Sequence, residues 1–143
     1  MISKNLIFDI DGTLWDATHQ ICEAYNEIIT KENKNYPLIT DDMMAGVMGL
    51  LIPDIADQFF PYLSKSERLT FIQKCCDNEN NHLKTHGGIL YPNVKEVLSQ
   101  LSKTYNLFIV SNCQDGYIDA LFTAHPIGQY FKDSECSGRT SLP

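Results

Sequence analysis

Residues 6–16 of the chain read LIFDIDGTLWD, a short apolar run that ends in two aspartates separated by one residue. Residues 6–10 have the length and composition of a buried strand, and in an open α/β sheet the functional groups lie just beyond the carboxyl ends of such strands. Asp9 and Asp11 occupy that place, and Gly12 lets the backbone turn sharply, so both carboxylates can face one pocket. An acidic β-turn alone would explain the Asp-Gly pair but not the apolar run before it.

A second apolar run, LFIV at residues 107–110, ends in the polar pair Ser111 and Asn112. Four consecutive apolar residues are typical of a parallel strand that is covered on both faces. Because parallel strands end at the same edge of a sheet, we expect Ser111 and Asn112 to lie where Asp9 lies. A helix expected over residues 115–123 would begin nearby, and helix N-termini favour anions.

The pattern Asp-x-Asp-Gly-Thr-x-x-Asp at residues 9–16 resembles the first signature of the haloacid dehalogenase-like superfamily, whose members mostly hydrolyse phosphate esters. The resemblance implies that Asp9 attacks phosphorus to form an aspartyl phosphate and that Asp11 is the general acid and base. It also implies Mg²⁺ as the cofactor, with the Asp9 carboxylate and the Asp11 carbonyl oxygen as ligands. Asp16 either belongs to the signature or caps the following helix, and we favour the cap.

The same resemblance implies that Gly12 and Thr13 in the first motif, and Ser111 and Asn112 in the second, bind the phosphate. In the second motif of this superfamily, a hydroxyl group and the next backbone N–H hold the phosphate oxygens. The second aspartate, Asp11, indicates a phosphatase or a phosphomutase rather than a dehalogenase. The leaving group of a dehalogenase needs no proton from this position, whereas the leaving alcohol of a phosphate ester does. A small phosphorylated metabolite is the expected substrate, and phosphoglycolate is the named candidate.

Roughly a hundred residues separate the two motifs, far more than one crossover helix requires, so an inserted unit is expected. Its pattern is helical: apolar residues recur at helical spacing after Asp16 and after the capping-box sequence at residues 64–67. Two shorter helices are expected, near residues 43–50 and from Pro53 to about Phe60.

By its position, this unit resembles the helical cap that many superfamily members insert directly after the first motif. We assign residues 16–86 to the cap, and residues 1–15 and 87–143 to an α/β core. The core is expected to be a partial Rossmann-like parallel sheet with about three strands.

Within the cap, His19 and the segment from Gly46 to Gly49, including Met48, are the expected contacts for the substrate. Two glycines and three methionines in residues 43–49 can form an adaptable surface, although we favour core packing for this segment.

The composition argues against several classes of protein. The net charge of −7 and the lack of a basic face argue against a nucleic-acid partner. No apolar stretch approaches membrane-spanning length, and the first strand leaves no room for a signal sequence, so we expect a cytoplasmic protein without a membrane partner.

Five cysteines without C-x-x-C spacing indicate reduced structural thiols. Cys113 is expected in the wall of the site, with a thiol activated by a helix N-terminus as the alternative.

The superfamily supplies a Lys in its third motif and an acidic pair in its fourth, and the only cations after Ser111 are Lys132 and Arg139. Residues 134–143 resemble the run that leads to that Lys, so we expect the N-terminal part of a longer phosphatase, weakly active or inactive alone. An alternative function is a catalytically incompetent fragment or interaction protein. The unpaired edge of its first strand would then bind another chain, and self-association through this edge is one form of such binding.

Overall fold

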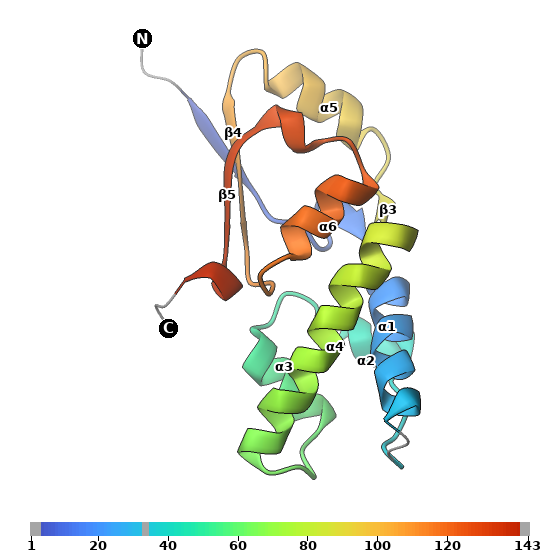
Figure 1. Ribbon diagram of the computed structural model, residues 1–143. Helices are drawn as coiled ribbons and strands as arrows, with labels where there is room; N and C mark the ends of the chain where they lie inside the picture. Colours follow the sequence, from blue (N-terminus) through green and yellow to red (C-terminus); the bar gives the residue numbers. More distant parts are fainter. Residues whose placement is uncertain (1–3, 33–34, 141–143) are drawn as a thin grey trace.

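The computed structural model describes residues 4–32 and 35–140. Figure 1 shows two groups of elements that lie end to end, a sheet with its helices and a bundle of helices. The sheet contains β1 (Asn5–Phe8), β4 (Asn106–Ser111) and β5 (Phe131–Cys136), which are parallel and ordered β1-β4-β5. The predicted α/β class and the three parallel strands are confirmed.

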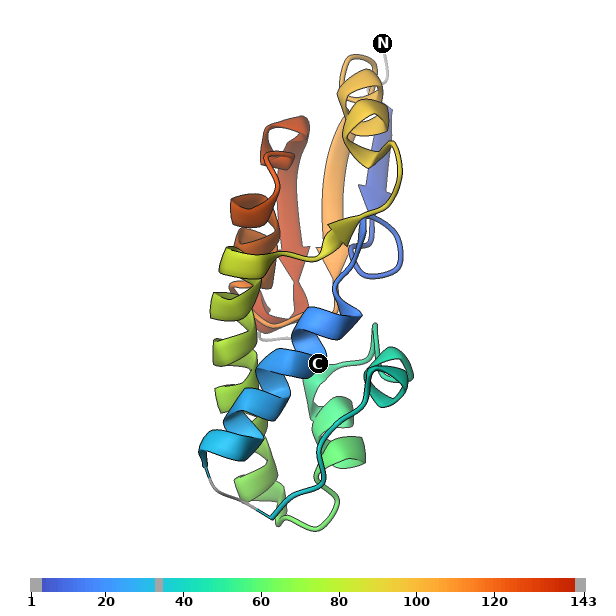
Figure 2. The same cartoon turned by 90° about the vertical axis from the view of Figure 1, so that its right-hand side faces the viewer.

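Two helices lie on one face of this sheet. α5 (Val94–Leu101) precedes β4, and α6 (Tyr117–Ala124) connects β4 to β5. Figure 2 shows both on the same side of the strands. The rule that crossovers between parallel strands are right-handed explains this, because the strand order advances in a single direction from β1 to β5.

The two faces of the sheet differ in exposure. Leu107 and Ile109 of β4 point toward the helices and are 0% exposed. Ile7 of β1 and Val110 of β4 lie on the other face and are 69% and 52% exposed. The expectation that the strand at residues 106–112 is covered on both faces is therefore wrong for the described part of the chain, because α5 and α6 share one side.

The second group consists of α1 (Thr18–Lys31), α2 (Asp41–Ala45), α3 (Ile52–Phe59) and α4 (Lys65–His86), of which α1 and α4 pack along each other. α4 begins at the predicted capping box, in which Ser64 accepts a hydrogen bond from the Glu67 backbone and Glu67 accepts one from the Ser64 backbone.

The helix predicted near residues 43–50 is shorter than expected. Thr40 caps it, because its hydroxyl oxygen accepts a hydrogen bond from the Met43 backbone at 3.2 Å. The helix ends at Ala45, and the chain continues as turns to Gly49. Gly49 has a φ of +86°, a conformation that no helix can contain, so this segment forms a loop.

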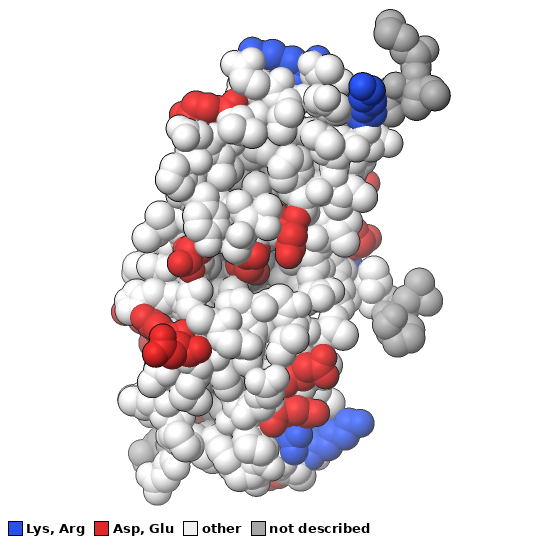
Figure 3. Space-filling model, turned by 180° about the vertical axis from the view of Figure 1, so that it is seen from behind, with Lys and Arg blue, Asp and Glu red and all other residues white. Residues whose placement is uncertain are grey.

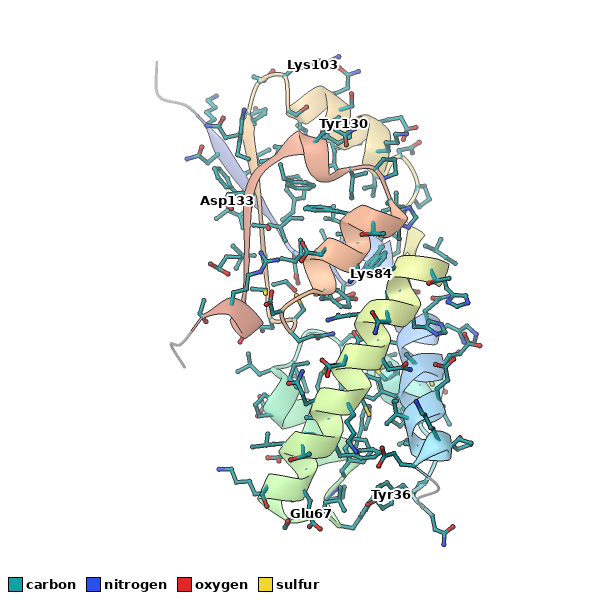
Figure 4. The ribbon with its side chains drawn as sticks, viewed as in Figure 1. Tyr36, Glu67, Lys84, Lys103, Tyr130 and Asp133 are labelled. Carbon is teal, nitrogen blue, oxygen red and sulfur yellow. The ribbon has the colours of Figure 1, made fainter. Side chains whose placement is uncertain are left out.

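Aromatic packing closes the end of the bundle that is remote from the sheet. The ring of Phe71 on α4 lies 5.3 Å from Tyr36 and 4.9 Å from Phe60, measured between centroids. Figure 4 labels Tyr36 and Glu67 at this end of the molecule. Leu69 belongs to the apolar residues at helical spacing after the capping box, yet it is 42% exposed, because Phe71 fills the cluster in its place.

A small antiparallel ribbon, which was not predicted from the sequence, joins the two groups. β2 (Trp15–Asp16) pairs with β3 (Ile89–Leu90), at the two points where the chain passes between the sheet and the helical bundle. The approach is close: a Cβ atom added to Gly88 would lie 2.8 Å from Trp15. Two-residue strands are too short to show a period-2 pattern, so the sequence carries no signal for them.

None of the helices in the described residues is long and apolar enough to cross a membrane. The expectations about a signal sequence and about the end of the chain involve residues 1–3 and 141–143, which lie outside the described residues.

Candidate active site

The carboxyl ends of the three parallel strands point toward the helical bundle (Figures 1 and 2). A cavity of about 320 Å³ lies where the two groups meet, and residues from both groups line it. It brings together six of the residues predicted for the site: Asp9, Asp11, Met48, Gly49, Ser111 and Asn112. Their roles in catalysis and binding stay predictions.

A tight turn after β1 carries Asp11 back beside Asp9. The Ile10 carbonyl oxygen accepts hydrogen bonds from the backbone N–H groups of Thr13 and Leu14 at 3.1 and 2.8 Å. Gly12 adopts a φ of +76°, the left-handed conformation that this reversal needs. Gly12 and Thr13 themselves lie in the exposed turn and are not among the residues that line the cavity.

Asp9 and Asp11 lie in different environments. Asp9 is exposed, and its Oδ1 accepts a hydrogen bond from the backbone N–H of Ile10 at 2.8 Å. Oδ1 of Asp11 accepts hydrogen bonds from Nε1 of Trp15 at 3.1 Å and from the Tyr117 hydroxyl group at 2.5 Å.

Burial raises the pKa of Asp11 to about 6, although the hydrogen bonds from Tyr117 and Trp15 lower it. The nearby charge of Asp9 adds a smaller increase. A carboxyl group that exchanges its proton near neutral pH suits a general acid and base, whereas an exposed carboxylate suits a nucleophile. The pair therefore has the two properties that phosphoester hydrolysis through a covalent intermediate requires.

Neither partner of Asp11 was predicted. Trp15 lies inside the first motif, and Tyr117 lies in the helix expected over residues 115–123. Their rings pack edge to face, with centroids 5.8 Å apart. The sequence signal that could have identified them is a buried aromatic side chain with one polar atom, which needs a hydrogen-bond partner.

The second motif contacts the cap. Ser111 ends β4 and is 8% exposed. Nδ2 of Asn112 donates a hydrogen bond to the Gly49 carbonyl oxygen at 3.0 Å. This bond joins the loop after β4 to the glycine-containing loop of the cap, so both loops border the same cavity.

His19 lies outside the cavity. Its side chain is 61% exposed, and Nδ1 lies 2.9 Å from Oδ2 of Asp41. The hydrogen bond with Asp41 raises the pKa of His19. Asp16 is also engaged locally: its Oδ1 accepts a hydrogen bond from the Thr18 backbone at 3.0 Å, at the first residue of α1. This contact fits the capping role, although Ala17 occupies the N-cap position itself.

Glu79 of α4 lines the cavity and was not predicted. It is 3% exposed, and burial raises its pKa to about 8. Hydrogen bonding with Gln114 and Tyr25 lowers this pKa, and the charge of Asp11 raises it. A sequence signal exists, because Glu79 lies at helical spacing between the buried residues Cys76 and Leu83 and thus interrupts an apolar stripe.

The five cysteines are free and buried, as predicted. Burial raises the pKa of the Cys113 thiol above its ordinary value, so the alternative of an activated thiol is wrong.

The cations near the end of the described chain do not reach the cavity. Nε of Arg139 lies 2.9 Å from Oδ1 of Asp115, and Lys132 is exposed on β5. None of the described residues that line the cavity is Lys, Arg or His. In Figure 3, Asp and Glu side chains gather over the middle of the molecule, whereas Lys and Arg lie toward its two ends.

The donor set suits a hard cation. The Asp9 carboxylate and the Asp11 carbonyl group supply oxygen ligands, and Mg²⁺ usually completes its coordination with water and substrate oxygens. Residues 4–32 and 35–140 contain no group of three or more His, Cys, Asp or Glu side chains placed to hold a metal. Any Mg²⁺ here would therefore rely on few protein ligands from these residues.

The structure thus combines a Rossmann-like parallel sheet, two aspartates directly after its first strand, and a bundle of helices beside them. The chain belongs to the haloacid dehalogenase-like hydrolase family, whose sequence profile matches residues 6–141. The sequence has no significant match among curated proteins.

Solved structures share this fold. The chain is similar to a haloacid dehalogenase-like hydrolase from Bacteroides fragilis, at 19% identity and a TM-score of 0.81, covering 98% of this chain and 66% of that one. A predicted phosphoglycolate phosphatase from Haemophilus somnus matches at 24% identity and a TM-score of 0.83, covering 99% and 64%. CbbY from Rhodobacter sphaeroides, solved with phosphate, matches at 14% identity and a TM-score of 0.79, covering 99% and 66%. The chain thus spans about two thirds of these structures, and such identities show the fold alone.

Proposed function

We propose that this chain carries the nucleophile and the general acid and base of a magnesium-dependent phosphatase that acts on small phosphate monoesters. The observation that carries the proposal is the pairing of exposed Asp9 with partly buried Asp11, whose pKa lies at about 6, at one cavity. The family, and the phosphatase named among the solved structures, support this class of reaction. A cytoplasmic location stays a prediction.

In the proposed mechanism, an Asp9 carboxylate oxygen attacks phosphorus and the bond to the alcohol oxygen breaks. Protonated Asp11 gives its proton to the departing oxygen. Asp11 then takes a proton from water as that water attacks the aspartyl phosphate, which releases phosphate and restores Asp9. Trp15 and Tyr117 orient the Asp11 carboxyl group throughout. The Asp9 carboxylate and the Asp11 carbonyl oxygen would hold Mg²⁺, whose charge offsets that of the phosphoryl group.

Chemical trapping of the intermediate tests this mechanism even when turnover is slow. The chain is incubated with Mg²⁺ and acetyl phosphate, reduced with borohydride, and digested for mass spectrometry, because reduction of an aspartyl phosphate leaves homoserine. We expect homoserine at position 9 in the wild type and none in Asp9→Asn. Asp133→Asn, on β5 and outside the cavity lining, is the control and should behave as the wild type (Figure 4 labels Asp133). Trapping at another position, or its persistence in Asp9→Asn, would contradict the mechanism.

A second proposed function is association through the open face of the sheet. Ile7 and Val110 place exposed apolar surface there, and β1 lies at the edge of the sheet in the described residues. We propose a second copy of this chain as the partner.

Because the described residues that line the cavity include no Lys, Arg or His, the chain alone should bind a phosphate dianion weakly and turn over slowly.

A further inference from the structure

The cap forms one wall of the cavity, and that wall is almost entirely apolar. It consists of side chains from α1, α2, α3 and the loop between α2 and α3, among them Ile21, Met44 and Ile55. Tyr25 adds a hydroxyl group, which lies 3.7 Å from Sγ of Cys76. The alcohol part of a phosphate monoester would lie against this wall, because Asp9 and Asp11 hold the opposite side.

Glu79 is the exception on the cap side. Its carboxyl group is almost fully buried yet lines the cavity. The charges of both Asp11 and Glu79 raise the pKa of Tyr117, so both carboxyl groups lie near the same phenol. Because Asp11 would protonate the departing oxygen and Glu79 lines the same cavity, Glu79 would lie beside the remainder of the departing alcohol.

The ionisable side chains around the cavity can carry only negative charge. Asp9, Asp11 and Glu79 line the cavity, Glu79 becomes a carboxylate above about pH 8 because burial raises its pKa, and the described lining includes no cationic side chain. A ligand carboxylate pressed against this wall would lose its hydration and meet no positive partner, which is costly at a buried site. An ammonium or hydroxyl group would instead donate a hydrogen bond to the Glu79 carboxyl group.

We propose that Glu79 selects the departing alcohol: the cavity accepts phosphate monoesters whose alcohol carries a hydrogen-bond donor, an ammonium or a hydroxyl group, and disfavours those whose alcohol carries a carboxylate. This inference rests on the proposed phosphatase function and narrows its substrate class. It also argues against phosphoglycolate as the preferred substrate.

Binding, rather than turnover, tests the inference. Affinities for phosphoethanolamine, glycerol 3-phosphate and phosphoglycolate are measured by calorimetry with Mg²⁺ at about pH 9, where Glu79 is ionised, in the wild type and in Glu79→Gln. The control is Asp77→Asn on the same helix, an exposed carboxylate that accepts a hydrogen bond from Gln73. Circular dichroism verifies that each variant folds.

We expect the wild type to bind both donor-bearing esters about tenfold or more tightly than phosphoglycolate, the size of effect that one buried charge-assisted contact produces. Glu79→Gln should lose the preference for the ammonium ester, and Asp77→Asn should keep it. Equal or tighter binding of phosphoglycolate by the wild type, or an unchanged ranking in folded Glu79→Gln, would overturn the inference. Failure to bind any of the three esters would overturn it too, while homoserine trapping at Asp9 judges the reaction class separately.

Discussion

The hydroxyl group of Tyr117 donates a hydrogen bond to Oδ1 of Asp11 at 2.5 Å, between residues that lie 106 positions apart in the chain. The bond connects the first residue of α6 to the turn that follows β1. It favours the ionised form of a carboxyl group that burial would otherwise keep protonated. The position of α6 therefore lowers the pH at which Asp11 exchanges its proton, against the larger effect of burial.

Replacement of the Tyr117 hydroxyl group should change the pKa of Asp11. In Tyr117→Phe the pKa of Asp11 should rise above about 6, by roughly one unit, because a hydrogen bond to the charged form is lost. An NMR titration of the Asp11 carboxyl carbon measures the change. Tyr130→Phe, at the far end of the core (Figure 4), is the matched control and should leave the titration unchanged. A pKa that falls or stays constant in Tyr117→Phe would show that the bond does not stabilise the carboxylate.

Glu79 should make stability decrease as pH rises. Its pKa is about 8 in the folded chain against 4.5 as the ordinary value, so the folded state holds a proton that the unfolded state has already lost. The free energy of unfolding should therefore fall between about pH 4.5 and pH 8 and level off above it. Each unit of pKa difference corresponds to about 1.4 kcal/mol, so the total effect is at most a few kcal/mol.

Glu79→Gln should lack this slope, and its stability relative to the wild type should improve as pH rises from 5 to 8. Urea denaturation at several pH values measures the difference. Asp11 contributes a similar slope at lower pH in both proteins, because burial also raises its pKa. Parallel curves for the two proteins across this range would indicate that Glu79 is already ionised in the folded state.

The loop between α2 and α3, which contains Met48, should influence substrate choice, and His19 should not. Met48 lines the cavity, whereas His19 lies on the surface beside Asp41. Met48→Ala should therefore change the order of affinities among phosphate monoesters, and His19→Ala should preserve it. Calorimetric titration with the same three esters provides the comparison. The same order of affinities in Met48→Ala and the wild type would remove the loop from the list of contacts.

A charge on the open face of the sheet should weaken association. In Ile7→Lys an exposed apolar side chain of the edge strand becomes cationic, which disfavours pairing with a second copy. Light scattering over a range of concentrations should then give a lower average mass than for the wild type. Ile89→Lys is the control, because Ile89 is about as exposed as Ile7, at 71% against 69%. Ile89 lies on β3, which is not part of the three-stranded sheet. A monomeric wild type at all concentrations would contradict the proposed association.

Several elements could be predicted from the sequence alone, because their formation depends on residues that are neighbours in the chain. The start of α4 depends on Ser64 and Glu67, which satisfy each other's free backbone groups within one turn. The strand at β4 and the turn at Gly12 likewise follow from neighbouring residues, an apolar run in one case and a positive φ in the other. The pairing of Asp9 and Asp11 could be predicted for the same reason, since both lie within one short motif.

The tertiary structure alone decided which distant residues meet Asp11. Tyr117 and Glu79 reach the cavity from two different helices, and His19 points away from it although it lies close to the motif in sequence. The open face of the sheet likewise depends on both helices taking one side. Hydrophobic periodicity identifies the buried side of a helix but not the element that covers it. The contact with Tyr117 that lowers the pKa of Asp11 therefore follows from packing between elements, which no local pattern encodes.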